Sequence, residues 1–267
     1  MLFRSAAAVE GGQDISVGQL ITAMRHADRA QEIAELAVRH RDRGVVGFDI
    51  AGAEAGFPAG RFTETFTWLA EQHLPATVHA GEGDGLASVK DALVNGRAQR
   101  LGHGVRLAED IDIEFGAVDE DGEQLDADTG LVELGPTATW VRERQIALEV
   151  CPSSNLQTGA VDPAQGIEGH PIDMLVQLGF RITVNTDNRL VSDVSLTDEL
   201  YLLAETFGYT LPQLLDLQLN AAEAAFLPVE EREELAELLV AAWNPVISGS
   251  GDAPRLAELP ADDADQD

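Results

Sequence analysis

Short apolar, β-prone runs alternate with amphipathic helical stretches along most of the chain. Six runs are predicted to be strands, at residues 17–23, 45–50, 76–79, 99–102, 147–150 and 182–185. Such alternation is typical of a parallel sheet wrapped by helices. The hydrophobic pattern therefore predicts an α/β fold.

The connection between the first two strands predicts a helix that Asp28 caps and that ends before Gly44. Ile33, Leu36, Ala37 and His40 are spaced to share one face of this helix. We expect that face to pack on the sheet.

The later connections divide into one loop and several helices. Residues 109–135 are acidic and rich in Gly and Asp, which predicts a long surface loop before a short helix at 137–144. Only helical stretches are predicted after the sixth strand, at 196–207, 211–225 and 230–242. Residues 1–247 are therefore expected to form one partial barrel domain, and 248–267 an acidic, disordered tail.

Six strand–helix units fit two architectures, an open doubly wound sheet or an incomplete (β/α)8 barrel of the TIM type with about six of its eight strands. Nearly every predicted strand ends in a motif containing His, Asp, Glu or Asn. Barrel enzymes place their chemistry at those ends, whereas a doubly wound sheet concentrates it at one switch point. The sequence has no G-x-G-x-x-G after a strand and no G-x-x-x-x-G-K, which disfavours a nucleotide-phosphate site.

The charge balance excludes some classes of partner. The chain has 17 basic and 47 acidic residues among 267, a formal net charge of -30. Nucleic-acid backbones and anionic membranes would be repelled, so neither is an expected partner. The single cysteine, Cys151, cannot form an internal disulfide, and no apolar run is long enough for a membrane-spanning helix or a secretory signal. We expect a cytoplasmic protein.

The sharpest local motif is Val78-His79-Ala80-Gly81-Glu82, in which a strand ends in a histidine and a carboxylate follows three residues later. A neutral imidazole binds zinc well, and a nearby glutamate can move protons without coordinating the ion. Alone, the motif is more typical of a histidine that only caps or hydrogen-bonds within a loop than of a metal ligand.

Two further strand ends carry similar chemistry. His103 ends the next strand between two glycines, and Asp187 follows the last strand. In a barrel these ends face one pocket, so His79, Glu82, His103 and Asp187 could surround one metal-activated water. Their wide spacing excludes a zinc finger or a single helix as the scaffold.

Five motifs occur in the order and form of the adenosine deaminase family, which the chain resembles from about Val17 to about Phe226. They are Phe48-Asp49-Ile50-Ala51-Gly52, the His79 to Glu82 motif, Arg100 to Gly104, Glu149-Val150-Cys151-Pro152-Ser153-Ser154-Asn155, and Val184 to Asn188. The resemblance implies a zinc-dependent (β/α) barrel that hydrolyses adenosine, a small purine nucleoside, to inosine and ammonia.

The resemblance also implies residue roles. His79 and Asp187 would be zinc ligands, Glu82 the proton donor to the purine ring, and His103 the residue that orients the attacking water. The backbone N–H of Gly52 would bind the purine. One zinc ion per complete enzyme would supply hydroxide at neutral pH, because zinc lowers the pKa of a bound water to about 7.

Asn188 is the first of two departures from the family pattern, because many members have a second Asp there. That acid contacts an imidazole nitrogen of the purine. An Asn NH₂ can donate to that nitrogen directly, so Asn188 is interpreted as a variant substrate-binding residue.

The second departure is the lack of a His-x-His pair, which in the family ends the first strand and supplies two zinc ligands. None of the six histidines forms such a pair. His40 and His73 fall in helical stretches and His170 in a loop. His26 lies just after the first predicted strand, near the mouth of the expected barrel. The family has a similar Met-Arg-His there without using it as a ligand.

The six-strand count agrees with this lack, and the two remaining strands are expected before Met1. The oligomeric state is left open.

Three functional interpretations follow. The first is an adenosine deaminase that is truncated at its N-terminus. The second is a non-catalytic remnant that binds a purine or a protein partner. The third is a sister deaminase acting on adenine or another purine. Cys151 is interpreted as structural, because no adjacent histidine pattern would activate it as a nucleophile.

Overall fold

Six parallel strands form the main sheet of the computed structural model, which describes residues 17–115 and 130–249. The strands lie in the order β1 (Gln19–Met24), β2 (Val45–Ala51), β3 (Ala76–Ala80), β4 (Arg100–His103), β7 (Ala147–Val150) and β8 (Ile182–Val184). The six predicted strands are confirmed to within two residues at each end. Because the spatial order follows the chain order without reversal, the sheet is part of a barrel rather than a doubly wound sheet.

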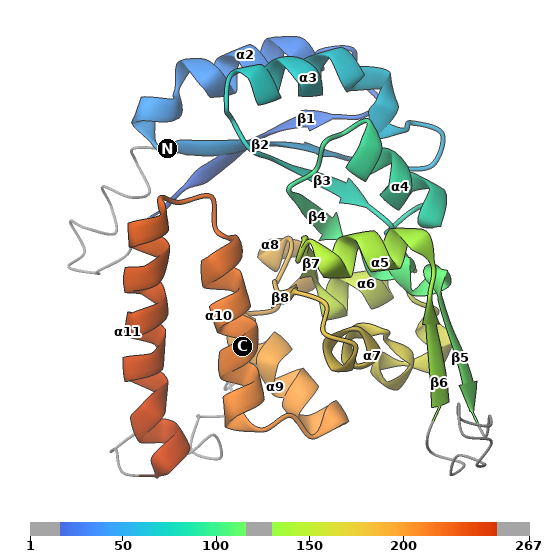
Figure 1. The fold of residues 1–267 in the computed structure, drawn as a ribbon, viewed down its shortest axis with the longest axis vertical. Helices are drawn as coiled ribbons and strands as arrows, with labels where there is room; N and C mark the ends of the chain where they lie inside the picture. Colours follow the sequence, from blue (N-terminus) through green and yellow to red (C-terminus); the bar gives the residue numbers. More distant parts are fainter. Residues whose placement is uncertain (1–16, 116–129, 250–267) are drawn as a thin grey trace, which may run out of the picture.

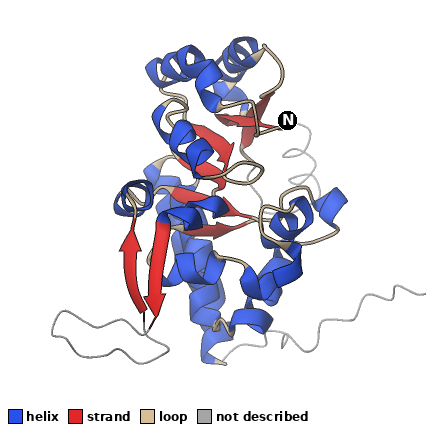
Figure 2. Ribbon diagram, turned by 90° about the vertical axis from the view of Figure 1, so that its right-hand side faces the viewer, coloured by secondary structure: helices blue, strands red, loops and turns tan. Residues whose placement is uncertain are grey.

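Helices cover the sheet and continue beyond its last strand (Figures 1 and 2). In chain order they are α2 (Ala30–Arg39), α3 (Thr63–Glu71), α4 (Leu86–Val94), α5 (Pro136–Glu143), α6 (Pro152–Thr158), α7 (Ile172–Gln177), α8 (Arg189–Ser192), α9 (Leu196–Phe207), α10 (Leu211–Ala224) and α11 (Val229–Ser248). Figure 1 shows α2 and α3 along the top of the molecule, over β1 and β2, and α10 beside α11 at the lower left. Helix α11 is longer than the helix predicted at 230–242. Of the tail predicted at 248–267, only residues 248 and 249 lie within the described residues.

The core lies between the strands and their helices. Val78, Leu101, Leu148 and Ile182 come from four neighbouring strands, and each is fully buried. Strands covered on both faces are expected to be nearly continuously apolar, which explains why they could be recognised from the sequence.

The predicted packing of the first helix was partly wrong. Helix α2 buries Ala30, Ala34 and Ala37, whereas Leu36 is exposed. Asp28 does not cap it; the side chain accepts a hydrogen bond from Arg61 at 2.9 Å instead. Alanines allow the helix to lie close to β1 and β2, so the buried face is set by small residues rather than by the largest ones.

The predicted surface loop at 109–135 was wrong at both ends. Strands β5 (Ile111–Phe115) and β6 (Gly130–Leu134) form an antiparallel pair, separate from the main sheet. Ile111 and Ile113 alternate with acids, which is a strand pattern that the acidic composition concealed. The expected loop between them falls at 116–129, outside the described residues.

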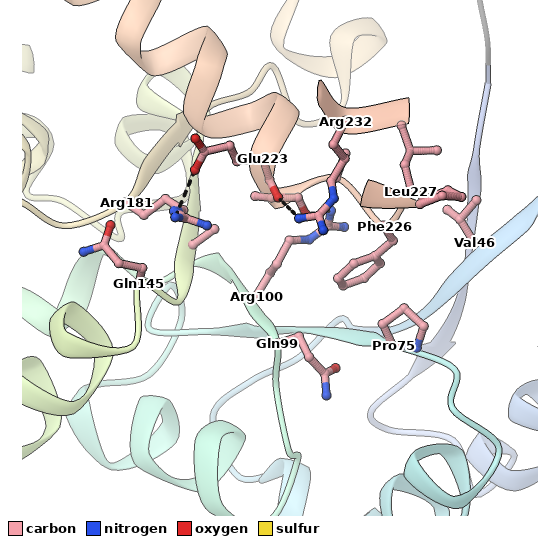
Figure 3. Close-up of a pocket in the computed structure, with 14 residues that line it drawn as sticks. Val46, Pro75, Gln99, Arg100, Gln145, Arg181, Glu223, Phe226, Leu227 and Arg232 are labelled. Carbon is pink, nitrogen blue, oxygen red and sulfur yellow. Dashed lines mark hydrogen bonds and ion pairs between the residues drawn. The ribbon is translucent and has the colours of Figure 1, made fainter. Parts of the chain in front are cut away.

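A cavity of about 470 Å³ lies at the amino ends of the strands, and none of His79, Glu82, His103 and Asp187 lines it (Figure 3). Its arginines bind the last helices, either to the sheet or to one another. Arg181 pairs with Glu223 at 3.0 Å, and Arg232 donates to the Glu223 carbonyl at 2.7 Å. Arg100 donates to the Ala224 carbonyl at 3.0 Å and stacks on Phe226. These contacts indicate a structural role for this end of the sheet.

Within the described residues, no helix combines the length and the apolar character that a bilayer-spanning segment needs.

Candidate active site

The carboxyl ends of β3, β4 and β8 converge on a pocket of about 220 Å³. Its lining includes His79 from β3, His103 from β4 and Asp187 from the turn after β8. Because Ala80 pairs with His103 in the sheet register, the two histidines lie on adjacent strands, and their rings are 5.2 Å apart. The structure thus places the predicted histidines and the acid at one site.

Glu82, His103 and Asp187 form a cluster at the edge of this pocket, which His103 and Asp187 line. One donor atom from each lies within 4.8 Å of the others, and Glu82 Oε2 is 3.3 Å from His103 Nε2. Ser154 donates its hydroxyl hydrogen to Asp187 at 2.7 Å, which orients that carboxylate. His103 and Asp187 both have positive φ, +63° and +53°, a conformation that is uncommon outside glycine and often marks functional positions.

His79 is oriented by an acid beneath it. Its Nδ1 is 2.9 Å from Oδ1 of Asp49, a buried residue of β2. Burial lowers the pKa of His79, but the Asp49 hydrogen bond and charge outweigh it, with smaller contributions from Glu149 and Glu82, and raise the pKa to about 9. With Nδ1 engaged, Nε2 is the ring nitrogen left for a ligand.

The loop that carries Glu82 is held by a second buried acid, Glu54. Its carboxylate accepts hydrogen bonds from the backbone N–H groups of residues 81–84, at 2.5, 3.0, 2.6 and 3.1 Å. Successive N–H groups around one anion form a stable nest. Gly81 within it has φ +74°, which a side chain would strain.

Arg25 lies fully buried beneath the same loop and donates hydrogen bonds to the carbonyls of His79 and Phe57. Burial lowers the pKa of its guanidinium, while the charges of Glu54 and Asp49 oppose that shift. The buried cation therefore balances the two acids that position His79 and the Glu82 loop.

The donor set suits a divalent ion in part. His79 Nε2 and the Asp187 carboxylate are an imidazole and an oxygen ligand of the kinds that zinc accepts, and both line the pocket. A tetrahedral zinc site needs further ligands, and the sequence contains no His-x-His pair to supply two of them. The residue types thus suit part of a zinc site, whereas the donor atoms that lie within 4.8 Å of one another belong to Glu82, His103 and Asp187 and not to His79.

The family model described as adenosine deaminase matches residues 3–242. The chain belongs to the adenosine deaminase family. An adenosine deaminase from Mycobacterium sp. (strain KMS) is 46% identical over 243 residues, which are 91% of this chain and 63% of that protein. The chain therefore spans somewhat less than two thirds of the length of this relative.

Solved structures share the fold at low sequence identity. Adenine deaminase from Arthrobacter aurescens superposes with a TM-score of 0.73 at 21% identity, covering 90% of this chain and 66% of that one. An amidohydrolase from Burkholderia ambifaria, solved with bound Zn, gives 0.75 at 20% identity, covering 92% and 61%. These likenesses support an incomplete α/β barrel.

Two residues predicted to bind substrate lie at the rim. Gly52 directly follows β2, is exposed, and has φ +95°. That φ favours glycine, because a side chain would strain it, whereas the 2.8 Å approach of an added Cβ to the flexible Met24 Cε could be relieved by movement of the methionine. Asn188 accepts hydrogen bonds through Oδ1 from the N–H groups of Leu190 and Val191, at 3.2 and 3.3 Å. Its NH₂ group is thereby turned away from helix α8, and the substrate roles of both residues stay predictions.

Cys151 is buried beside the pocket, and its thiol donates to the Glu149 carbonyl at 3.4 Å. Burial raises its pKa well above the usual value, and Asp187 and Glu149 add to the shift. A thiol held in its neutral form is a poor nucleophile, which supports the structural interpretation.

Among the residues that support the site, Asp49, Glu54, Asn155 and His170 had no role predicted from the sequence. Asp49 and Asn155 belong to recognised motifs but received no role, and His170 was placed in a loop away from the site. Only distances in the fold reveal their partners, since each acts on a residue 15 to 52 positions away.

Proposed function

We propose that this site carries out the hydrolytic deamination of adenosine and 2'-deoxyadenosine, with water as co-substrate and inosine or deoxyinosine plus ammonia as products. The carrying observation is the convergence of Glu82, His103 and Asp187 within 4.8 Å, beside His79. Membership of the adenosine deaminase family supports the choice of a purine substrate.

One zinc ion, held by His79 Nε2 and Asp187 together with ligands from beyond this site, would supply hydroxide at neutral pH by lowering the pKa of water to about 7. Asp49 keeps the His79 ring oriented through Nδ1, and Ser154 does the same for the Asp187 carboxylate. Such supporting contacts typically change metal affinity by about 10- to 100-fold.

Glu82 is the proposed proton donor to the purine ring nitrogen next to the reacting carbon. Protonation there withdraws electrons from the carbon and prepares it for attack, an effect of roughly 10²- to 10⁴-fold. The nest around Glu54 holds the loop that carries Glu82. His103, 3.3 Å from Glu82, would orient the attacking water. The Gly52 N–H and the Asn188 NH₂ would bind the purine at the rim.

The test uses an extended chain, defined as this chain joined at its N-terminus to the His-x-His strand segment of a family member. Adenosine, adenine and adenosine monophosphate are supplied in turn, and loss of the aminopurine absorbance is followed. Release of ammonia with adenosine as the best substrate is expected. Preference for adenine would favour the sister-deaminase alternative instead. No turnover of any aminopurine, despite bound zinc, would favour the non-catalytic remnant.

The proposed activity belongs to purine metabolism, and a cytoplasmic location is proposed with it. The acidic surface is compatible with a small-molecule substrate and disfavours nucleic acid.

A further inference from the structure

His103 is connected to the interior by a chain of three hydrogen bonds. Its Nδ1 is 3.1 Å from Nδ2 of Asn155, in α6. Oδ1 of the same Asn155 is 3.3 Å from Nε2 of His170, and His170 Nδ1 accepts the backbone N–H of Ile172 at 3.1 Å. Asn155 is fully buried, and the two histidines are 2% and 3% exposed.

The direction of this chain of hydrogen bonds is set at one end. A backbone N–H can only donate, so His170 Nδ1 must accept from Ile172. A neutral imidazole carries one proton, which then resides on Nε2 and is donated to Asn155. Burial lowers the pKa of His170 to about 4, so the ring is neutral at pH 7.

The orientation of the Asn155 amide links the proton position on His170 to the proton position on His103. Because its Oδ1 accepts from His170, the other end must be the NH₂ group, which donates to His103 Nδ1. The two ends of an amide are otherwise hard to distinguish, but here the neighbouring donor decides the orientation. His103 Nδ1 is therefore an acceptor, and its ring proton resides on Nε2.

We propose that Asn155 and His170 are positioning residues that fix His103 in the tautomer with its proton on Nε2, directed toward Glu82 and the pocket. His103 then offers a hydrogen-bond donor to the site, 3.3 Å from the Glu82 carboxylate. The catalytic meaning of this tautomer rests on the proposed function, because only a deaminase would use it to orient water. The tautomer itself can be measured without any substrate.

The experiment is a long-range ¹H–¹⁵N correlation spectrum of the chain as it exists, labelled with ¹⁵N-histidine, at pH 7 without metal. Protonated and unprotonated ring nitrogens have well-separated ¹⁵N shifts. We expect His103 and His170 each to carry the proton on Nε2. A proton on His103 Nδ1 in the unmodified chain would overturn the proposal, whether or not the protein deaminates adenosine.

Substitutions test the relay, by which we mean the hydrogen bonds from His170 through Asn155 to His103. Asn155→Asp replaces the NH₂ donor with a carboxylate oxygen, so His103 Nδ1 should become protonated while His170 is unchanged. Asn244→Asp is the matched control, because it makes the same change at an exposed position of helix α11, and it should leave both tautomers unchanged. An Nδ1 of His103 that stays unprotonated in Asn155→Asp would contradict the relay.

A second pair of variants covers the case in which Asn155→Asp does not fold. His170→Gln keeps an NH₂ donor for Asn155 and should preserve the His103 tautomer. His170→Phe removes that donor and should give a mixture of both tautomers. Equal spectra for the two variants would overturn the role of His170. In the extended chain, Asn155→Asp should lower kcat and leave KM within about twofold, as expected for an effect on the reacting groups.

Discussion

The Nδ1 atom of His79 lies 2.9 Å from Oδ1 of Asp49, and this contact joins the ends of two neighbouring strands beneath the pocket. The contact determines two properties of the His79 ring. It leaves Nε2 for a ligand, and it raises the pKa of His79 to about 9 although burial lowers it.

Asp49→Asn should lower the pKa of His79 below its present value of about 9 in the metal-free chain. The amide can still hydrogen-bond but carries no charge, so burial then dominates. A ¹H NMR titration of the imidazole checks this. Asp28→Asn, which removes an exposed acid paired with Arg61, should not change the titration. An unchanged pKa of His79 in Asp49→Asn would show that another group controls it.

The same pair predicts how stability depends on pH. Because the folded pKa of His79 exceeds the unfolded value of 6.5, its contribution is fully present below pH 6.5 and is lost as pH rises through about 9. The free energy of unfolding of Asp49→Asn should therefore differ most from that of the unmodified chain at pH 6 and least at pH 9.5. Urea unfolding at both pH values measures the difference.

Glu54→Ala should release the loop that carries Glu82, because four backbone N–H groups lose their acceptor and Arg25 loses a nearby charge. Removing one partner of such a buried network costs about 3 kcal/mol. Hydrogen exchange at residues 81–84 should become at least about tenfold faster.

Glu109→Ala is the matched control for this loop. The exposed carboxylate of Glu109 accepts the backbone N–H of Leu86 at 3.0 Å and pairs with Arg106. Exchange should change at Leu86 and not at residues 81–84. Equal protection of residues 81–84 in Glu54→Ala and in the unmodified chain would rule out the nest as the anchor.

Glu82→Gln in the extended chain should abolish turnover of adenosine while zinc stays bound. The amide keeps the size of the side chain but cannot donate a proton as an acid does. Steady-state absorbance assays and metal analysis of the same sample give both quantities. Deamination at the unmodified rate would show that another group protonates the purine.

His170 makes a separate pH prediction with the opposite sign. Its folded pKa of about 4 lies below the unfolded value of 6.5, so the unfolded chain binds a proton first as pH falls. The unmodified chain should lose about 2 kcal/mol more stability between pH 7 and pH 5 than His170→Gln does. If the urea midpoints of the two proteins fall equally between pH 7 and pH 5, the result would contradict a buried, neutral His170.

Much of the fold could be predicted, because strands buried on both faces leave continuous apolar runs. Val78, Leu101 and Leu148 lie in such runs, and their strands were placed to within two residues. The pair β5 and β6 was missed because Ile111 and Ile113 alternate with acids inside a Gly- and Asp-rich segment. Asp28 was expected to cap α2, but a partner 33 positions away, Arg61, binds it instead.

The site, too, has residues that the sequence could predict and residues that it could not. His79, Glu82, His103 and Asp187 could be named in advance because each follows an apolar strand within a family motif. The residues that orient them could not. Asp49 hydrogen-bonds across adjacent strands, Glu54 binds a loop 27 to 30 positions away, and His170 acts through Asn155. Such contacts depend on register and loop geometry, which hydrophobic periodicity does not report.

The most direct test of the convergence of strand ends on one zinc ion is the metal content of the extended chain and its variants after equilibration with zinc. We predict one zinc per molecule, lost in His79→Ala and Asp187→Ala. Zinc should be retained in the matched control His73→Ala, whose exposed histidine follows helix α3 away from the pocket. Full zinc occupancy in both His79→Ala and Asp187→Ala would contradict the account.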